Sequence, residues 1–593
     1  MKTKIGGQAV LEGVMMRGAT SMALAVRDEL GNIRLDTTRL ATKKPWYRKV
    51  PFLRGIVNLV TSMIDGSKII GKSAEVMVEE VDTKGEGGMG WLMTISMLLG
   101  VALALALFVV LPTYVTKGIF ALAKLDTSSL EWVWLKSLIE GVAKILILIG
   151  YMAGISQMKE IKRVFMYHGA EHKTIACYEA ELPLTVENVQ KCSRYHDRCG
   201  TSFIVFVVVL SVILMMVLDV VCAVVEFTLF LDNWWMRALL KIALLPVTAG
   251  ISYEMLMLLA CSNFILFRPL KWLGKQFQKL TTREPDDGMC EVAIAAFNKV
   301  LEMDADVTIP EQHFPDPIPL SEFRAQVLES GLMEHVKGDV AWLLMAMLNI
   351  KKEDLSKNIK IPYGWTLRLQ KMKERIDAGE PWQYVVGKTE FYSRTFIVNK
   401  DVLIPRQETE LVCEQLIKHL DKSESVLDLC CGSGAIGITV EREIEKMHDV
   451  ALGVTVTCAD VSKDALKVAK QNAKLNKAKV SFVQSDMFEN VKRKFDAIVC
   501  NPPYIESDVI ETLDDSVKNY EPHLALDGGE DGLKFYRILS EQAHLHLNKG
   551  GVMVLEIGYN QGEAVKALFE DKYDVQVLKD YGGNDRIVIA KLK

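Results

Sequence analysis

Residues 495–504 read Phe-Asp-Ala-Ile-Val-Cys-Asn-Pro-Pro-Tyr, an apolar run that ends in a rigid tetrapeptide. The apolar run predicts a buried strand over 495–500. Two consecutive prolines fix φ twice and remove two backbone donors, so the chain leaves the strand in a stiff turn. Asn501 brings an amide and Tyr504 a flat ring, and together they suit a planar amino group. An ordinary strand-ending turn is the alternative, because Asn and Pro are common turn residues.

The flanking sequence alternates between strand and helix patterns. Strands are predicted at 425–429, 454–459, 480–484 and 495–500, and helices at 408–419, 435–446 and 463–476. Strands that alternate with helices indicate an α/β doubly wound parallel sheet, the Rossmann-like architecture.

Each of these four strands is followed by residues that suit a ligand. The first strand contains Asp428 and runs into a turn of small residues, the second ends at Asp460, and the third is followed by Asp486 and Met487. The turn consists of Cys430, Cys431, Gly432, Ser433 and Gly434. Because parallel strands end at one edge of a sheet, these groups and Asn501 are expected to line one site.

The residue types indicate a nucleoside ligand. A turn of small residues lets a ligand approach the backbone, and the helix after it supplies unpaired amides. A phosphate loop is excluded because no Gly-Lys-Ser/Thr follows. Asp460 suits the two hydroxyls of an adenosine ribose, although a strand-ending Asp is often only a helix cap. Met487 and Asp486 are placed to meet the adenine.

The second half of the chain resembles the peptide chain release factor glutamine N5-methyltransferases over residues 320–593. The resemblance rests on Asn-Pro-Pro-Tyr and on segments at 380–384, 403–412, 521–533 and 583–586. It implies a small helical substrate-recognition domain at 320–385 and a class I methyltransferase domain at 386–593. It also implies S-adenosylmethionine as cofactor and, as substrate, the glutamine of the Gly-Gly-Gln loop in class 1 release factors.

The resemblance assigns catalysis and substrate binding to Asn501, Pro502, Pro503 and Tyr504. The Asn501 oxygen and the Pro502 carbonyl are expected to accept the two N–H bonds of the target amide, with Tyr504 packed on its plane. Cys430 and Cys431 stand where the family more often has Gly and Thr. Met487 stands where an aromatic residue is frequent, so adenine packing is expected there rather than stacking.

Two other functions remain open. A DNA adenine or cytosine amino-methyltransferase uses the same kind of motif. Residues 311–593 carry 45 acidic and 37 basic side chains, so no direct contact with nucleic acid is expected from this half. The other alternative is a membrane-anchored scaffold with an inactive methyltransferase fold.

The first half contains long apolar segments that predict about four membrane spans, at 91–111, 138–155, 201–218 and 239–267. The segments around residues 159–200 and after 268 are rich in Lys and Arg, whereas the intervening connections are poor in them. The positive-inside rule therefore predicts a multi-pass protein of the bacterial cytoplasmic membrane, in contact with the lipid bilayer. Both termini and the methyltransferase domain are expected in the cytoplasm.

The loop at 157–200 gathers potential metal ligands. His168, Glu171 and His172 lie at i, i+3 and i+4, on one face of a helix, and His196 and Cys199 follow. These residue types could ligate Zn²⁺ or another transition metal. A polar network at the membrane surface is the alternative.

The first half also resembles a family of uncharacterised multi-span bacterial membrane proteins. The shared motifs are Gly-Gly-Gln-Ala-Val-x-Glu-Gly-Val-Met-Met-Arg-Gly at 6–18, His-Gly-Ala-Glu-His-Lys at 168–173 and two further segments at 194–203 and 281–287. The chain is therefore interpreted as a fusion protein. Its first half divides into a cytoplasmic region at 1–90, a membrane domain at 91–270 and a tail with linker at 271–319.

Overall fold

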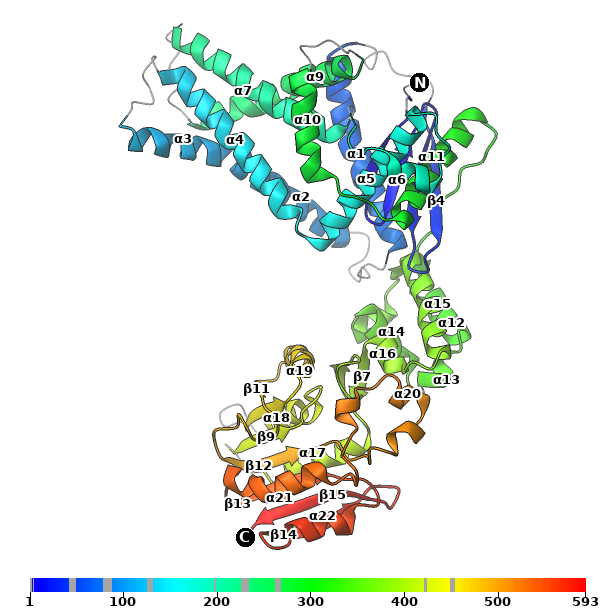
Figure 1. Ribbon diagram of the computed structural model, residues 1–593, viewed down its shortest axis with the longest axis vertical. Coiled ribbons are helices and arrows are strands. Elements are labelled where there is room, and N and C mark those ends of the chain that lie inside the picture. The colour runs from blue at the N-terminus through cyan, green and yellow to red at the C-terminus, as the bar shows by residue number, and fades with distance from the viewer. Residues whose placement is uncertain are drawn as a thin grey trace. The chain divides into compact units, whose positions relative to one another are not determined.

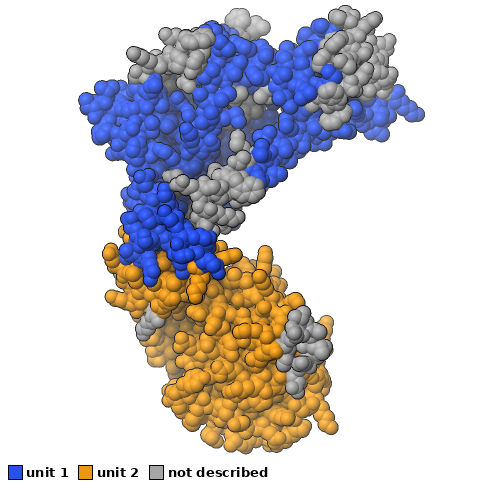
Figure 2. Space-filling model, turned by 180° about the vertical axis from the view of Figure 1, so that it is seen from behind, with its two compact units in different colours: residues 1–325, 353–368 blue, residues 326–352, 369–593 orange. Residues whose placement is uncertain are grey.

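The computed structural model describes most of the chain. The described residues are 3, 5–41, 50–77, 88–124, 132–196, 199–224, 234–261, 268–336, 338–420, 424–447 and 454–593. The chain divides into two compact units, residues 1–325 with 353–368 and residues 326–352 with 369–593 (Figure 2). The boundary falls within helices α12 (Leu320–Glu329) and α15 (Tyr363–Asp377).

The second unit contains a seven-stranded sheet in the order β11-β10-β9-β12-β13-β15-β14 (Figure 1). Neighbours from β11 to β13 are parallel, and β15 pairs antiparallel with β13 and β14. The strands are β9 (Ser425–Leu429), β10 (Thr455–Asp460), β11 (Val480–Gln484), β12 (Phe495–Cys500), β13 (Leu547–Glu556), β14 (Tyr573–Lys579) and β15 (Asp585–Leu592). The strand order reverses between β9 and β12, which is where open α/β sheets bind ligands.

Helices cover both faces of this sheet. One face packs on α17 (Glu408–Lys418), α18 (Ala435–Met447) and α19 (Lys463–Asn476). The other packs on α21 (Lys534–His546) and α22 (Gly562–Phe569). Val499 belongs to the first core and its neighbours Ile498 and Cys500 to the second, so β12 is buried on both faces. A continuous apolar run, rather than an alternating one, is typical of such a strand.

The helical region before the sheet is built from short elements. They are α13 (Leu332–Val336), α14 (Val340–Leu348), η5 (Lys352–Ser356) and α16 (Trp382–Val386), with a two-residue ladder of β5 (Ile318–Pro319) and β6 (Lys360–Ile361). Between β12 and α21 lie η6 (Ile510–Thr512), α20 (Asp515–Lys518) and η7 (His523–Ala525).

The sequence also predicts a hairpin that turns at Asn399-Lys400, and that position is wrong. The hairpin pairs β7 (Lys388–Phe391) with β8 (Arg394–Ile397) and turns at Tyr392-Ser393. Both turn residues have positive φ, 51° and 57°, the conformation that short hairpins require. Asn399 instead accepts a hydrogen bond from the Asp401 N–H at 2.9 Å, as Asn does in local turns.

The first unit contains an antiparallel sheet that the sequence did not predict. It consists of β1 (Gly6–Val10), β2 (Gly13–Arg17), β3 (Ser21–Arg27) and β4 (Ile33–Arg39). One face packs on α5 (Lys159–Glu179) and α11 (Asp287–Ala305), and the short α6 (Val186–Lys191) extends that layer. The other face packs on α1 (Leu53–Val76). The sequence pattern also predicts an amphipathic helix at 56–80, and α1 accounts for this prediction up to Val76, whereas residues 78–80 lie outside the described residues.

The remaining helices of the first unit are apolar, except that the last of them carries four basic side chains. They are α2 (Gly88–Leu105), which continues through a π-helical turn (Ala106–Val110) into α3 (Leu111–Leu122), then α4 (Val133–Ile155), α7 (Gly200–Val224), α9 (Trp234–Cys261) and α10 (Arg268–Thr281). By length and composition, two stretches within the described residues could cross a membrane, Leu98–Leu122 and Trp134–Ile155. Val205–Val221 and Ile242–Met255 are apolar but shorter. Four spans therefore remain a prediction, and residues 262–267 of the fourth lie outside the described residues.

Candidate functional site

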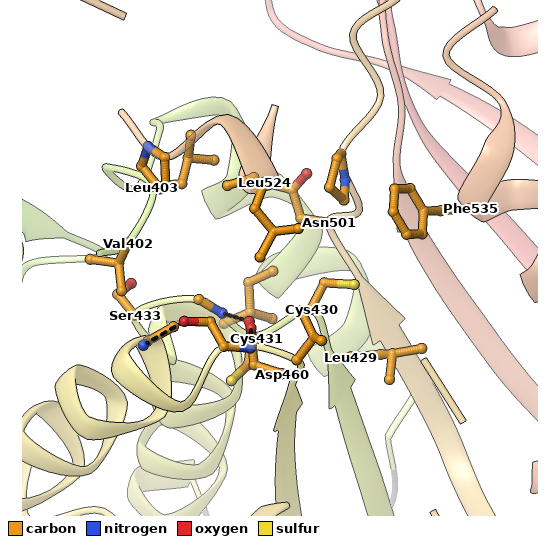
Figure 3. Close-up of a pocket in the computed structure, with 18 of the residues that line it drawn as sticks. Val402, Leu403, Leu429, Cys430, Cys431, Ser433, Asp460, Asn501, Leu524 and Phe535 are labelled. Carbon is orange, nitrogen blue, oxygen red and sulfur yellow. Dashed lines mark hydrogen bonds between the residues drawn. The ribbon is translucent and has the colours of Figure 1, made fainter. Parts of the chain in front are cut away.

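A cavity of about 290 Å³ opens at the carboxyl ends of β9, β10 and β12 (Figure 3). This is the point at which the strand order reverses, and the volume is close to the ~300 Å³ lower end of small-molecule sites. Most of the predicted ligand-binding residues line the cavity. They are Cys430, Cys431, Gly432, Ser433, Asp460, Asp486, Met487, Asn501 and Pro503.

The turn after β9 is held in a left-handed backbone. Cys430, Gly432 and Gly434 have φ of 58°, 54° and 77°. A Cβ added to Gly434 would lie 3.0 Å from Ile438 Cδ1, whereas one added to Gly432 would meet no atom within 4 Å. Gly434 therefore lets α18 pack closely, and Gly432 leaves the floor of the cavity open to a ligand.

Asp460 fastens this turn to the end of β10. One carboxylate oxygen accepts the Gly432 N–H and the other accepts the Ser462 N–H, each at 2.8 Å. Burial raises the pKa of Asp460, because the charged form is less well solvated there. Each oxygen keeps a further lone pair, so Asp460 can still accept hydroxyl groups from a ligand. The helix cap of α19 is Ser462, whose hydroxyl accepts the Ala465 N–H, so Asp460 holds the turn rather than capping the helix. Its position on the cavity wall keeps a ligand role as a prediction.

Four of the predicted site residues do not line the cavity: Asp428, Gly434, Pro502 and Tyr504. Asp428 is fully buried under the turn, where its Oδ2 accepts the Gly437 N–H of α18 at 2.8 Å. Burial raises its pKa to about 7, and its Oδ1 has no hydrogen-bond partner among the described residues. Asp428 thus supports the turn from below.

A chain of hydrogen bonds runs behind Asn501. Its amide nitrogen donates to Thr409 Oγ1 at 3.5 Å, and the Thr409 hydroxyl donates to Glu556 Oε2 at 2.6 Å. The Tyr504 hydroxyl donates to the other Glu556 oxygen at 3.2 Å. Burial raises the pKa of Glu556, whereas the Thr409 hydroxyl and the positive Arg586 favour its charged form. The sequence by itself indicates no role for Thr409 or Glu556, and only the position of Thr409 inside the 403–412 segment could have drawn attention to it.

The backbone of Asn-Pro-Pro-Tyr is clamped by the segment 521–533. A Cβ on Gly528 would lie 2.8 Å from Tyr504 Cα, and one on Gly532 would lie 2.5 Å from the Tyr504 carbonyl oxygen. The Ile505 N–H donates to the Leu526 carbonyl at 3.1 Å, and the Gly528 N–H returns a bond to Ile505 at 2.7 Å. The glycines of this segment are therefore required by close packing against residues 504 and 505.

An ion pair at the cavity joins two of the motif segments, 403–412 and 521–533. Arg406 Nη2 donates to Glu521 Oε1 at 2.5 Å, and Glu521 Oε2 accepts the Ile404 N–H at 3.2 Å. The Glu521 side chain is 1% exposed and Arg406 is 36% exposed and lines the cavity. Other lining residues that the sequence did not single out are Val402, Leu524, Lys534, Phe535 and Ile538.

A second cluster of functional groups lies in the first unit. His168 and His172 project from α5 with ring centroids 4.4 Å apart, and His168 Nε2 lies 3.3 Å from Cys199 Sγ. One ligand atom from each of these three residues lies within 4.8 Å of the others. Burial opposes the charged form of His168, but Cys199 and Glu171 outweigh it and raise the pKa of His168 to about 9. Burial likewise opposes ionisation of Cys199, but His172 and His168 bring its pKa well below the usual value.

The other two predicted metal ligands differ from these three. Glu171 is buried beside the cluster, and its pKa is raised by burial. His196 is tilted against His172 at 5.8 Å between ring centroids, and its Nε2 lies 3.4 Å from Glu179 Oε2. The structure therefore brings His168, His172 and Cys199 together, with Glu171 adjacent and His196 at the margin.

The sheet order, the cavity at its switch point and the polar groups at the strand ends define a methyltransferase with a Rossmann-like fold. A model of the methyltransferase small domain matches residues 405–530, and a model described as a protein of unknown function, DUF1385, matches residues 50–303. The chain is 42% identical over 325 residues to a release factor glutamine methyltransferase of Fusobacterium nucleatum, covering 54% of this chain and 83% of that protein. It is 35% identical over 318 residues to the uncharacterized protein YqhQ of Bacillus subtilis, covering 51% of this chain and 93% of that protein. The chain therefore belongs to both families, the release factor glutamine methyltransferases through its second half and the YqhQ-like proteins through its first.

The second half is accordingly an S-adenosylmethionine-dependent methyltransferase. A solved methyltransferase from Pyrococcus furiosus aligns with 38% of this chain and 97% of its own at 19% identity and a TM-score of 0.26. The fold assignment rests on the strand order and the family match, not on that alignment.

Proposed function

We propose that the second half of the chain transfers a methyl group from S-adenosylmethionine to the side-chain nitrogen (N5) of the glutamine in the Gly-Gly-Gln loop of class 1 release factors. Membership of the methyltransferase family supports the substrate, and the cavity supports the cofactor. The observation that carries the proposal for this chain is the orientation of the Asn501 amide.

That orientation follows from the hydrogen bonds behind Asn501. An ionised carboxylate only accepts hydrogen bonds, so Glu556 makes the Thr409 hydroxyl a donor. Thr409 Oγ1 is then left as the acceptor for the Asn501 nitrogen. The Asn501 oxygen is thereby turned away from Thr409, as an acceptor for an N–H bond of the substrate.

The residues around the cavity fit the cofactor. The open floor at Gly432 would admit its amino acid portion near the backbone, Asp460 would accept the ribose hydroxyls, and Met487 would pack beside the adenine. The bound cofactor supplies a methyl group on a positively charged sulfur. Asp428 takes part by holding the turn through Gly437 rather than by touching the ligand.

A glutamine amide nitrogen is a poor nucleophile, because its lone pair is delocalised into the carbonyl. The Asn501 oxygen and the Pro502 carbonyl would accept its two N–H bonds, which orients the nitrogen and offsets the positive charge that develops on it. Pro503 keeps these acceptors rigid, and Tyr504, fixed through its hydroxyl on Glu556, packs against the amide plane.

Residues 320–385 are proposed to recognise the release factor, as the family resemblance implies. DNA methylation is the second candidate, since its active sites also bind a planar amino group. The excess of acidic side chains in this half favours a protein substrate.

The test is methyl transfer by the full chain to an unmodified release factor, with the Gln→Ala release factor and duplex DNA as control substrates. Label is expected on the release factor alone, and label on DNA or none on the release factor would refute the proposal. Asn501→Ala is expected to lower kcat by about 10²–10³-fold, as for loss of a preorganised polar group. Cofactor affinity should change little, and equal losses in both would exclude the orienting role.

We also propose that the first half is a multi-pass domain of the cytoplasmic membrane, with both termini and the methyltransferase in the cytoplasm. Many large apolar side chains of α2, α3 and α4 are exposed, for example Leu99, Leu122 and Leu146. Contiguous exposure of this kind marks contact with lipid or another protein. The protein should stay with membranes after alkaline extraction, and protease added outside spheroplasts should leave its second half intact; release into solution or external cleavage would contradict the proposal.

A further inference from the structure

The first unit buries a set of polar side chains that the methyltransferase chemistry does not use. It lies where α5 meets the segment leading into α7, and it contains His168, His172 and Cys199. We propose that these three residues bind one divalent transition metal ion of the zinc type through His168 Nε2, His172 Nε2 and Cys199 Sγ. Glu171 faces the fourth coordination position.

Backbone carbonyl groups orient the imidazole rings of the two histidines as metal ligands. His168 Nδ1 lies 2.8 Å from the Thr281 carbonyl oxygen, and His172 Nδ1 lies 2.7 Å from the Arg194 carbonyl oxygen. A carbonyl only accepts, so each Nδ1 carries a proton and each Nε2 is the ring nitrogen left to bind a metal. Metal-binding histidines almost always donate their other ring N–H in this way, which fixes the tautomer and the ring orientation.

The spacing of the two histidines and the position of the Cys199 thiol bring three ligand atoms together. Residues at i and i+4 share a helix face, so α5 alone directs both imidazoles to one point. Cys199 reaches the same point, with its sulfur 3.3 Å from His168 Nε2. Two imidazoles and a thiolate are typical zinc ligands, and three protein ligands leave a fourth position for a solvent molecule.

The buried carboxylate of Glu171 is a second, independent observation that points to a bound ligand. Its carboxylate accepts a backbone hydrogen bond from Gly7, but its Oε2 is buried and has no hydrogen-bond partner among the described residues. The residue is 5% exposed, and an unpartnered buried carboxylate oxygen is costly. A Cβ at Gly7 would lie 2.8 Å from Glu171 Cγ, so a glycine is needed for β1 to approach this carboxylate. A solvent molecule on the metal would supply the missing donor.

A cysteine–histidine nucleophile is the competing interpretation, and burial argues against it. Cys199 is 4% exposed, whereas a nucleophilic thiol must reach its substrate. A nucleophile also requires one histidine, and here two fixed Nε2 atoms converge on the sulfur. The order His-x-x-Glu-His at 168–172 is also one in which two histidines bind zinc in a class of metalloproteases.

His196 provides a matched control. It is the third histidine of the same region, but it lies at the margin of the cluster and contacts Glu179. His196→Ala removes an imidazole that lies beside His172, at 5.8 Å between ring centroids, but that is not itself a proposed ligand. Cys192→Ser is the equivalent cysteine control, since Cys192 is a free, partly exposed thiol in the same unit.

The experiment measures metal in the full chain purified in detergent, loaded with Zn²⁺ and then dialysed against metal-free buffer. The wild type, His196→Ala and Cys192→Ser are expected to keep about one zinc per chain, and His172→Ala and Cys199→Ser to lose it, as expected when a ligand of a one-metal site is removed. Helix content by circular dichroism identifies any variant that fails to fold. No retained zinc in the wild type, or zinc retained at the wild-type level in either ligand variant, overturns the proposal.

Cobalt substitution keeps the test independent of variant folding. Co²⁺ in the folded wild type should give a near-ultraviolet thiolate-to-metal charge-transfer band, which Cys192→Ser should retain. A folded wild type without that band refutes thiolate ligation. Glu171→Gln should keep the site but weaken metal affinity by about 10–100-fold, as for partners that orient a metal ligand; unchanged affinity would remove Glu171 from the site.

Discussion

Glu556→Gln tests the hydrogen-bond chain that orients Asn501. Glu556 is 1% exposed and receives two hydroxyl donors, Thr409 at 2.6 Å and Tyr504 at 3.2 Å. A glutamine has the same shape but only one acceptor oxygen, and its NH₂ group must face one of the two hydroxyls. When the NH₂ faces Thr409, the Thr409 hydroxyl turns to Asn501, and the Asn501 amide must flip to accept it.

The size of the effect follows from those contacts. A hydrogen bond to a charged group contributes about 1.5–3 kcal/mol and a neutral one about 0.5–1.5 kcal/mol, so the 2.6 Å bond alone loses about 1–1.5 kcal/mol. A flipped Asn501 presents a donor where an acceptor is needed, and loss of one preorganised polar group costs about 2.7–4 kcal/mol. A mixture of the two orientations predicts a kcat lower by about 10–100-fold, at ~1.4 kcal/mol per tenfold change in rate.

Unlike kcat, the free energy of unfolding of Glu556→Gln should not fall. Because burial raises the pKa of Glu556, the folded chain binds a proton there more tightly than the unfolded chain. Between the unfolded pKa and the raised folded pKa, the free energy of unfolding contributed by this group therefore falls as pH rises. Glutamine does not titrate, so the variant avoids this fall; the gain offsets the about 1–1.5 kcal/mol lost with the Thr409 hydrogen bond, and the variant should be about as stable as wild type at neutral pH.

The assay compares kcat, cofactor affinity and the unfolding transition of Glu556→Gln with those of the exposed matched variant Glu563→Gln. A lower kcat with unchanged cofactor affinity and stability is expected for Glu556→Gln only. Unchanged kcat, or losses of activity, cofactor affinity and stability together, would refute the orienting role.

Three further predictions concern the methyltransferase unit. Cys430→Gly should raise its free energy of unfolding by up to about 1 kcal/mol in urea titrations, because a left-handed φ costs an L-residue about 1–2 kcal/mol and glycine returns only part of that as chain entropy; a loss of stability would contradict this. Asp428→Asn should make the fall in unfolding free energy between about pH 4 and about pH 7 shallower than in wild type, because Asp428, with a folded pKa of about 7, is one of several buried carboxyl groups with a raised pKa; parallel pH profiles for both proteins would be the contrary result. Arg406→Ala should destabilise the unit by about 1.5–3 kcal/mol, because Glu521 is buried and loses its charged partner, and by less than for a fully buried pair because Arg406 is 36% exposed. Arg406→Lys should lose less, and equal stability of the alanine variant would disprove the contribution of the pair.

The sequence was most informative where structure is set by near neighbours. The limits of β9, β11, β12 and α19 agree with the residue ranges predicted from apolar runs and the Gly, Pro, Asn and Asp residues that end them. The candidate cavity could be predicted for the same reason. In a parallel sheet the strand ends share one edge, so the order of the elements brings Gly432, Asp460 and Asn501 together.

Packing between segments far apart in the chain could not be predicted from these local sequence patterns. The sheet at residues 6–39 was not predicted, because its core comes from α5 and α11, which lie more than a hundred residues further along the chain. The turn at Tyr392-Ser393 was missed because neither residue type favours positive φ. In the first unit, spacing alone could not show that His196 lies outside the cluster of His168, His172 and Cys199. That distinction depends on how the chain folds to bring Cys199 against α5.

The sequence by itself thus determined the alternation of strands and helices, the ligand groups at the strand ends and the family resemblance of both halves. Local chemistry decides these features, because periodicity, turn residues and motif spacing are properties of short segments. The tertiary structure alone decided which of these residues line the cavity, and it leaves Asp428, Gly434, Pro502 and Tyr504 outside that lining. It also decided that Thr409 and Glu556, 147 residues apart, fix the amide of Asn501. Hydrogen bonds across such separations depend on the packed geometry of the whole unit, which no short segment encodes.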